Sequence, residues 1–197
     1  WDHMEMGMKT QFLELTEAQD PVYPIVSTHG TFGGTTVNQA TRLLRNGGYL
    51  YPSNGSSRGF RGDMDETAQI YEAAMAGREP AQRLLFGFGY GTDTNGLSAQ
   101  SGPRGDFDED KAVVYPFVLF SGAPFDALSG FDGAAPVTFA QPSSSDVDGS
   151  VRRTWHEDID GNAHYGLLSD YIQEIRLEGN ADHIRHLSNS AEVYLQT

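Results

Sequence analysis

Three side chains that can bind a metal ion stand near the ends of apolar runs in this chain: His3, His29 and Asp93. His29 follows the β-rich run at 22–27, and Asp93 follows the apolar run at 84–88 and its glycines. Two imidazoles and a carboxylate suit zinc and related divalent ions, which lower the pKa of a bound water to about 7 and so create a nucleophile. A carboxylate beside that water can also act as a general base. These residue types therefore predict metal-assisted hydrolysis, provided that the fold brings them together.

The elements that must position these residues alternate between helix and strand over the first 99 residues. Apolar periodicity predicts helices and strands in the order 5–17, 22–27, 36–45, 49–51, 63–76 and 84–88. Thr35 or Thr36 is expected to cap the second helix, and Asp63 the third. Each unit is about 30 residues long, which is typical of right-handed βαβ crossovers and a parallel sheet. Residues 1–3 are interpreted as the end of a further strand. In a barrel of parallel strands, residues at the carboxyl ends point into one mouth.

Residues 100–155 break this alternation and are rich in Gly, Pro, Ser and Asp. One apolar run, at 113–120, is expected to form a strand or a hairpin arm. Because a structureless loop of this length is uncommon in a compact domain, the segment is predicted to be an insertion over the site mouth, with a small β excursion. A helix is then predicted at 167–179 and a last helix at 181–195. The inward residues of the last helix are predicted to be Ile184, Leu187, Ala191 and Leu195.

The composition excludes several classes of function. The net charge of −14, with only 13 Lys and Arg, argues against nucleic acid as a partner, because phosphate binding needs clustered basic residues. The absence of cysteine excludes disulfides, cysteine-ligated zinc and thiol catalysis. No run approaches the ~20 apolar residues of a membrane span. Since the sequence opens at Trp1-Asp2-His3 rather than at Met, an N-terminal part of the protein is expected to precede it.

Short segments of the chain resemble a known family. WDHM, VSTHG and GTDTNG are similar to the fifth, sixth and eighth strand ends of the amidohydrolase-type metal-dependent hydrolases, nearest to the membrane-dipeptidase-like (peptidase M19-like) group. GNAHYGLLSDYIQEIR and NSAEVYLQT resemble the ends of bacterial secreted proteins of that barrel type, which would favour an extracytoplasmic location. The resemblance implies an α/β fold, the C-terminal half of a (β/α)8 TIM-type barrel with an irregular insertion after the last strand. Strands five to eight would then lie in 1–99, the insertion in 100–155 and the closing helices in 156–197.

The resemblance also implies roles for individual residues. His29 would be a metal ligand, Asp93 a ligand or the base that takes a proton from bridging water, and His3 a ligand or a substrate contact. Arg58, expected in the loop after the seventh strand, would anchor a substrate carboxylate through its guanidinium fork. Zinc is the expected metal, and a small amide or peptide-like compound the expected substrate. A lone half barrel would expose open sheet edges, so the missing N-terminal half, in the same or a separate chain, is the expected partner.

Two departures from the family pattern leave an alternative open. The seventh strand end, YLYPSNGSSRG, has no metal-binding His, and the metal ligands of the first strand and of the third or fourth strand would precede Trp1. The barrel could therefore be metal-free and act as a binding or structural protein through its insertion. A complete small α/β binding domain is a third possibility.

Other polar residues have structural interpretations. His29 can satisfy a backbone carbonyl, and Asp93 can form an Asx-turn. His164 is a further candidate for the site mouth, whereas His156, His183 and His186 are expected at the surface. The Asp-rich runs at 146–149 and 158–161 resemble fragments of calcium loops, but their spacing does not fit an EF-hand and turns are expected there. The glycines of GFGYG lack the spacing of a dinucleotide-binding loop.

Overall fold

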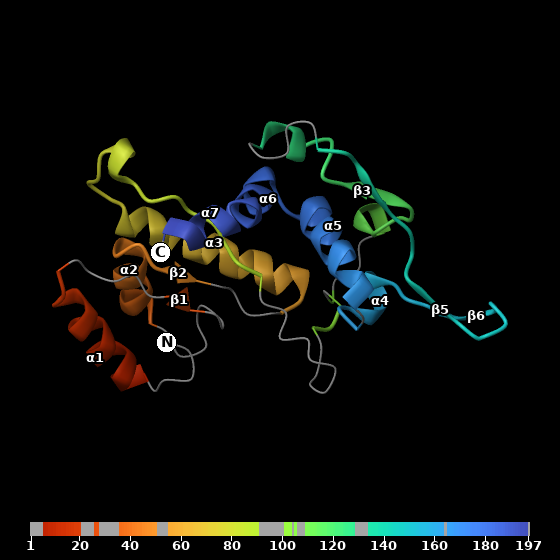
Figure 1. The fold of residues 1–197 in the computed structure, drawn as a ribbon, viewed down its shortest axis with the longest axis horizontal. Helices are drawn as coiled ribbons and strands as arrows, with labels where there is room; N and C mark the ends of the chain where they lie inside the picture. Colours follow the sequence, from red (N-terminus) through yellow and green to blue (C-terminus); the bar gives the residue numbers. More distant parts are fainter. Residues whose placement is uncertain are drawn as a thin grey trace. The chain divides into compact units, whose positions relative to one another are not determined.

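The computed structural model describes residues 6–20, 26–27, 36–50, 55–90, 101–103, 105, 109–128, 134–163 and 165–196 (Figure 1). The chain forms two compact units. Unit 1 comprises Trp1–Asn54, Gly62–Thr92 and His186–Thr197, and unit 2 comprises Gly55–Arg61 and Asp93–Arg185. Helices α3 (Ser57–Ala74) and α6 (Ala181–Ser188) therefore contribute residues to both units.

Unit 1 contains a βαβ element. Strand β1 (Val26–Ser27) pairs in parallel with β2 (Tyr49–Leu50), and helix α2 (Val37–Arg45) connects them. Thr36 begins the helix with a capping box, since its side chain accepts from the Gln39 amide (3.2 Å) while the Gln39 side chain accepts from the Thr36 amide (3.0 Å). The parallel pairing predicted for these two runs is confirmed, and the cap is Thr36 rather than Thr35. The half barrel around this element stays a prediction.

The core of unit 1 lies among three helices. Helix α1 (Met6–Glu17) occupies the predicted place and contributes Leu13, which packs with Leu43 of α2 and Met75 at the end of α3. Burial of each such side chain stabilises the fold by about 1.5–3 kcal/mol. At the edge of the core, Arg42 pairs with Glu17 at 2.6 Å, and this hydrogen bond lowers the pKa of the Glu17 carboxyl.

Helix α3 begins earlier than predicted. Ser56 rather than Asp63 is its cap, because the Phe60 amide donates to the Ser56 carbonyl at 2.9 Å and the Gly59 amide to the Ser56 side chain at 3.4 Å. The buried residues recur at helical spacing: Ser57, Phe60, Met64, Thr67, Ile70, Tyr71 and Ala74. The loop expected around Arg58 is therefore helical from Ser57 onward, and Arg58 lies in the first turn of α3.

The run at 84–88 is not a strand, which corrects the prediction. Its backbone groups bond to the Tyr71 hydroxyl of α3 and to residues at the C-terminal end of the chain, instead of to a neighbouring strand. The Phe88 amide donates to the His186 carbonyl (2.9 Å), and the Asn189 side chain donates to the Phe86 carbonyl (3.0 Å). The Gln196 side-chain amide both accepts from the Leu85 amide (3.0 Å) and donates to the Leu85 carbonyl (2.7 Å). The segment is thus extended but held by helices, with Phe88 fully buried.

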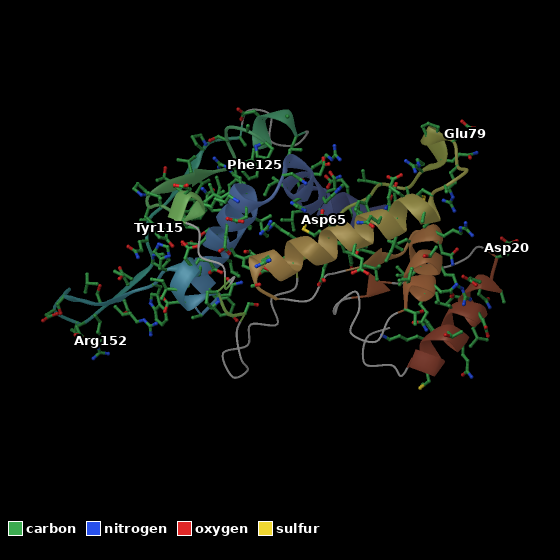
Figure 2. All side chains as sticks on the ribbon, turned by 180° about the vertical axis from the view of Figure 1, so that it is seen from behind. Asp20, Asp65, Glu79, Tyr115, Phe125 and Arg152 are labelled. Carbon is green, nitrogen blue, oxygen red and sulfur yellow. The ribbon has the colours of Figure 1, made fainter. Side chains whose placement is uncertain are left out.

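Unit 2 contains the β excursion expected in the insertion. Strand β3 (Phe117–Leu119) pairs antiparallel with β4 (Val137–Phe139), and the rings of Phe117 and Phe139 stack at 5.4 Å. Strands β5 (Ser143–Ser145) and β6 (Val151–Thr154) form a second antiparallel pair, which extends away from α4 and α5 (Figure 1). Arg152 lies on this hairpin, apart from Tyr115 and Phe125 (Figure 2). Gly149, at φ +84°, closes the turn, as expected for the run at 146–149.

Four helices lie in the C-terminal part of the chain: α4 (Glu157–Asp160), α5 (Leu168–Glu178), α6 and α7 (Ser190–Gln196). The second Asp-rich run is thus the one-turn helix α4 rather than a turn alone. The single last helix predicted at 181–195 is two helices separated at Asn189, whose carbonyl accepts from the Val193 amide at 2.9 Å at the start of α7. Val193 is buried, whereas Leu195, predicted to face inward, is 82 % exposed.

One-turn 3-10 helices occur at η1 (Pro80–Gln82), η2 (Glu109–Lys111), η3 (Phe125–Ala127) and η4 (Tyr165–Leu167). Within the described part of the chain, no helix has the length and hydrophobicity needed to span a bilayer.

Candidate functional site

The residues predicted to form the metal site, His3, His29 and Asp93, lie outside the described residues, as does His164. Their convergence on one mouth stays a prediction. Arg58 is described, and it is exposed on the first turn of α3 rather than in a loop. A guanidinium at the start of a helix is well placed for a carboxylate, because the helix dipole also favours an anion there.

Across the described ranges, no group of three or more His, Cys, Asp or Glu side chains is arranged to hold a metal ion. Imidazole nitrogen and carboxylate oxygen, the donors of His29 and Asp93, nevertheless suit zinc by type. A zinc site in this protein therefore depends on residues beyond the described ranges.

Four carboxyls on α4 and α5 are buried and are here named the acidic cluster: Glu157, Asp158, Asp170 and Glu174. Three of them are essentially inaccessible to solvent, with Glu157 1 % exposed and both Asp170 and Glu174 0 % exposed. The Tyr115 hydroxyl donates to one oxygen of Asp170, and the Ser169 hydroxyl donates to the other at 3.0 Å. Carboxyls are seldom fully buried unless a partner compensates the lost hydration, so the cluster is the first described place to search for chemistry.

The short helix α4 is held in place by its flanking residues. His156 is its cap and accepts from the Asp158 amide through Nδ1 at 3.3 Å, while the His156 amide donates to Asp160 at 2.9 Å. The Val113 amide donates to Asp158 at 3.0 Å, and the Tyr115 ring meets the His156 ring edge-on at 5.2 Å. These contacts fix a helix of one turn, which on its own would be too short to be stable.

Burial changes the acid strength of these groups. It raises the pKa of Glu157 from 4.5 to about 9, with further contributions from repulsion by Glu174 and Asp170. Burial also raises the pKa of Asp170, although the hydrogen bonds from Tyr115 and Ser169 oppose the shift. The pKa of Tyr115 itself is raised well above its ordinary value by burial and by the neighbouring Asp170. Glu157 is therefore protonated at neutral pH, as a general acid must be, but it has no access to solvent.

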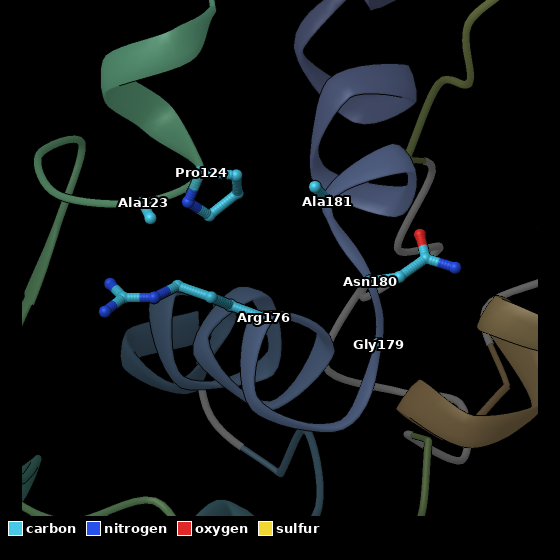
Figure 3. Close-up of a pocket in the computed structure, with 6 residues that line it drawn as sticks. All are labelled: Ala123, Pro124, Arg176, Gly179, Asn180 and Ala181. Atoms are coloured by element: carbon cyan, nitrogen blue, oxygen red, sulfur yellow. The ribbon is translucent and has the colours of Figure 1, made fainter.

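A separate pocket of about 230 Å³ lies between η3 and the junction of α5 and α6. It is lined by Ala123, Pro124, Arg176, Gly179, Asn180 and Ala181 (Figure 3). The Arg176 guanidinium donates to the Val118 carbonyl at 2.8 Å, and the Asn180 side chain caps α6 by accepting from the Asp182 amide at 2.9 Å. Figure 3 shows the Asn180 amide turned away from Pro124. Because both polar side chains are engaged in holding the fold, the pocket presents no converging set of groups for a ligand.

Sequence reasoning missed the acidic cluster and misplaced the three histidines that it expected at the surface. A signal for the cluster was present, since Asp170 and Glu174 are spaced i, i+4 on the same helix face as Tyr171 and Ile175. His183, expected at the surface, is 4 % exposed, and its Nδ1 accepts from the backbone amide of Asn180 at 3.1 Å. His156 and His186 are half-buried rather than exposed.

No protein family, no curated protein and no solved structure matches this chain. The resemblance to metal-dependent hydrolases is therefore confined to the short segments that carry it. Any assignment of function depends on the chemistry of the chain's own residues.

Proposed function

We propose that this chain is part of a metal-dependent hydrolase that cleaves an amide or peptide-like bond with a metal-activated water. The observation that carries the proposal is the βαβ element of unit 1. Strand β1 ends at Ser27, two residues before His29, and it pairs in parallel with β2. In parallel α/β folds, ligands and metals are bound where such strands end. The order of WDHM, VSTHG and GTDTNG along the chain adds support.

In this proposal, zinc held by His29 and Asp93 would supply a hydroxide nucleophile near neutral pH. Asp93 also takes the proton of the attacking water, which a carboxylate does as a general base. His3 contacts the substrate, and Arg58 binds its carboxylate from the first turn of α3. The remaining ligands come from the N-terminal half of the barrel, in the same or a separate chain, so the isolated 197 residues are expected to be inactive.

Elemental analysis of zinc tests the proposal. The full natural polypeptide should be prepared, loaded with zinc and freed of excess metal. Stoichiometric zinc is expected in the wild type, with loss in His29→Ala and Asp93→Asn, because each variant removes one donor. Asp20→Asn, which changes an exposed carboxylate after α1, is the matched control and should retain the metal. Absence of zinc from the loaded wild type, or retention in both site variants, would contradict the proposal.

One observation favours the second candidate, a metal-free barrel that binds a partner through its insertion. All residues of β6 are exposed, and Val147 at the hairpin turn is fully exposed. Apolar residues presented on a protruding hairpin are suited to contact another protein. A loaded protein without zinc would support this candidate over the hydrolase.

A further inference from the structure

Helices α4 and α5 meet through groups that all become negative when ionised. Glu157 is 1 % exposed, and its Oε2 has no hydrogen-bond partner among the described residues. Glu174 and Asp170 face it from α5, and Asp158 and Asp160 from its own helix. Among the described residues, the neighbouring titratable or charged groups include Tyr115, which donates to Asp170, His156, which caps α4, and Arg153, which pairs with Asp160 at 2.5 Å. Two further elements pack against α5: η2 carries Asp110 and Lys111, of which Lys111 pairs with Glu178 at 3.8 Å, and η4 carries Tyr165.

No cation among these groups compensates Glu157 itself. The Arg153 guanidinium is directed to Asp160 and also covers the Trp155 ring, at 3.7 Å from its centroid. An anion at Glu157 would therefore be buried beside other carboxylates, which is strongly unfavourable in a medium of low polarity. Ionisation of Glu157 would therefore destabilise the observed packing.

We propose that the contact between α4 and α5 is a pH-sensitive switch, which is closed while Glu157 is protonated and opens when an increase in pH makes Glu157 an anion. The direction follows from linkage. Burial and repulsion raise the pKa of Glu157 from 4.5 to about 9. The folded form thus holds this proton more tightly than the unfolded form, so the stabilisation is complete below pH 4.5 and is lost progressively as the pH rises toward 9.

Trp155 is a local reporter of this opening, because it lies two residues before Glu157 and the chain has only one other tryptophan, Trp1. In a Trp1→Phe background, urea unfolding followed by Trp155 fluorescence gives the folding equilibrium constant from pH 5 to 8. One linked proton predicts that this constant falls about tenfold for each pH unit. Glu157→Gln, which is isosteric with the protonated acid, should make this decrease clearly shallower. Glu192→Gln, which changes an exposed carboxylate on α7, is the matched control and should retain it.

The same slope in Glu157→Gln as in the Trp1→Phe parent would overturn the proposal. If Glu157→Gln does not fold, carbon-13 NMR titration of the glutamate carboxyls in the parent protein gives an independent result. A glutamate carboxyl that titrates between about pH 8 and 10 in the parent would support the proposal. Titration of every glutamate below pH 6 would overturn it.

Discussion

The close approach of residue 87 to helices α6 and α7 gives a quantitative prediction. A Cβ at Gly87 would lie 2.8 Å from the Asn189 Cβ, 2.8 Å from the His186 carbonyl oxygen and 3.0 Å from a Val193 methyl group. Ordinary contacts between carbon atoms are about 3.5–4.0 Å, so the neighbours would have to move by roughly 0.5–1 Å. Two of the three atoms belong to the backbone or to a Cβ, and no side-chain rotation can move them.

The movement also acts on hydrogen bonds that hold this segment. The Phe88 amide and the Phe86 carbonyl bond to His186 and Asn189, the same two residues that a Cβ would displace. Overpacking costs about 1–3 kcal/mol, and weakening one bond costs about 0.5–1.5 kcal/mol more. Gly87→Ala is therefore expected to destabilise unit 1 by about 2–4 kcal/mol, which lowers the melting temperature by roughly 4–16 °C in a protein of this size.

Thermal unfolding followed by circular dichroism measures this change. Gly62→Ala is the matched control, because Gly62 is exposed within α3 and has no atom within 4 Å of its Cβ position. The same substitution there should stabilise the helix by about 0.5–1 kcal/mol. A Gly87→Ala protein that melts at or above the wild-type temperature would refute the close packing of residue 87 against α6 and α7.

Two further predictions concern single hydrogen bonds. Thr36→Ala removes the capping box of α2 and should destabilise unit 1 by about 1 kcal/mol in urea unfolding, whereas an unchanged midpoint would contradict the cap. Tyr115→Phe removes the donor to Asp170 and should cost about 1–3 kcal/mol. Burial raises the pKa of Asp170, and the hydrogen bond from Tyr115 partly offsets this rise. Loss of the hydrogen bond therefore raises the pKa of Asp170 further. The cost should therefore be larger at pH 8 than at pH 5, and equal costs at the two pH values would contradict this account.

The local signals in the sequence predicted α1, α2 and the parallel strand pair of unit 1. Thr36 and Gln39 are three residues apart, so the start of α2 depends on neighbours that the sequence displays directly. The run at 84–88 was misassigned because its partners, such as Gln196, come from a helix about one hundred residues later. Alternating apolar residues indicate an extended segment but do not specify which groups form hydrogen bonds with its backbone.

The candidate site was less predictable from the sequence than the fold. His29 and Asp93 were selected by residue type and position after apolar runs, and their geometry lies outside the described residues. The acidic cluster escaped notice because carboxyls are ordinarily expected in water. Its burial depends on Tyr115, which is 55 residues away from Asp170 and contacts it only in the folded chain.

The two hydrogen bonds between Gln196 and Leu85 make one primary amide act as a substitute for an adjacent β-strand. A side chain that makes the hydrogen bonds of a neighbouring strand occupies the backbone N–H and C=O groups of the extended segment. Those are the groups through which extended segments pair with other polypeptides. Removal of that amide would leave the Leu85 peptide groups open to such recruitment. The end of α7 thus shields a potential nucleus for intermolecular β-assembly.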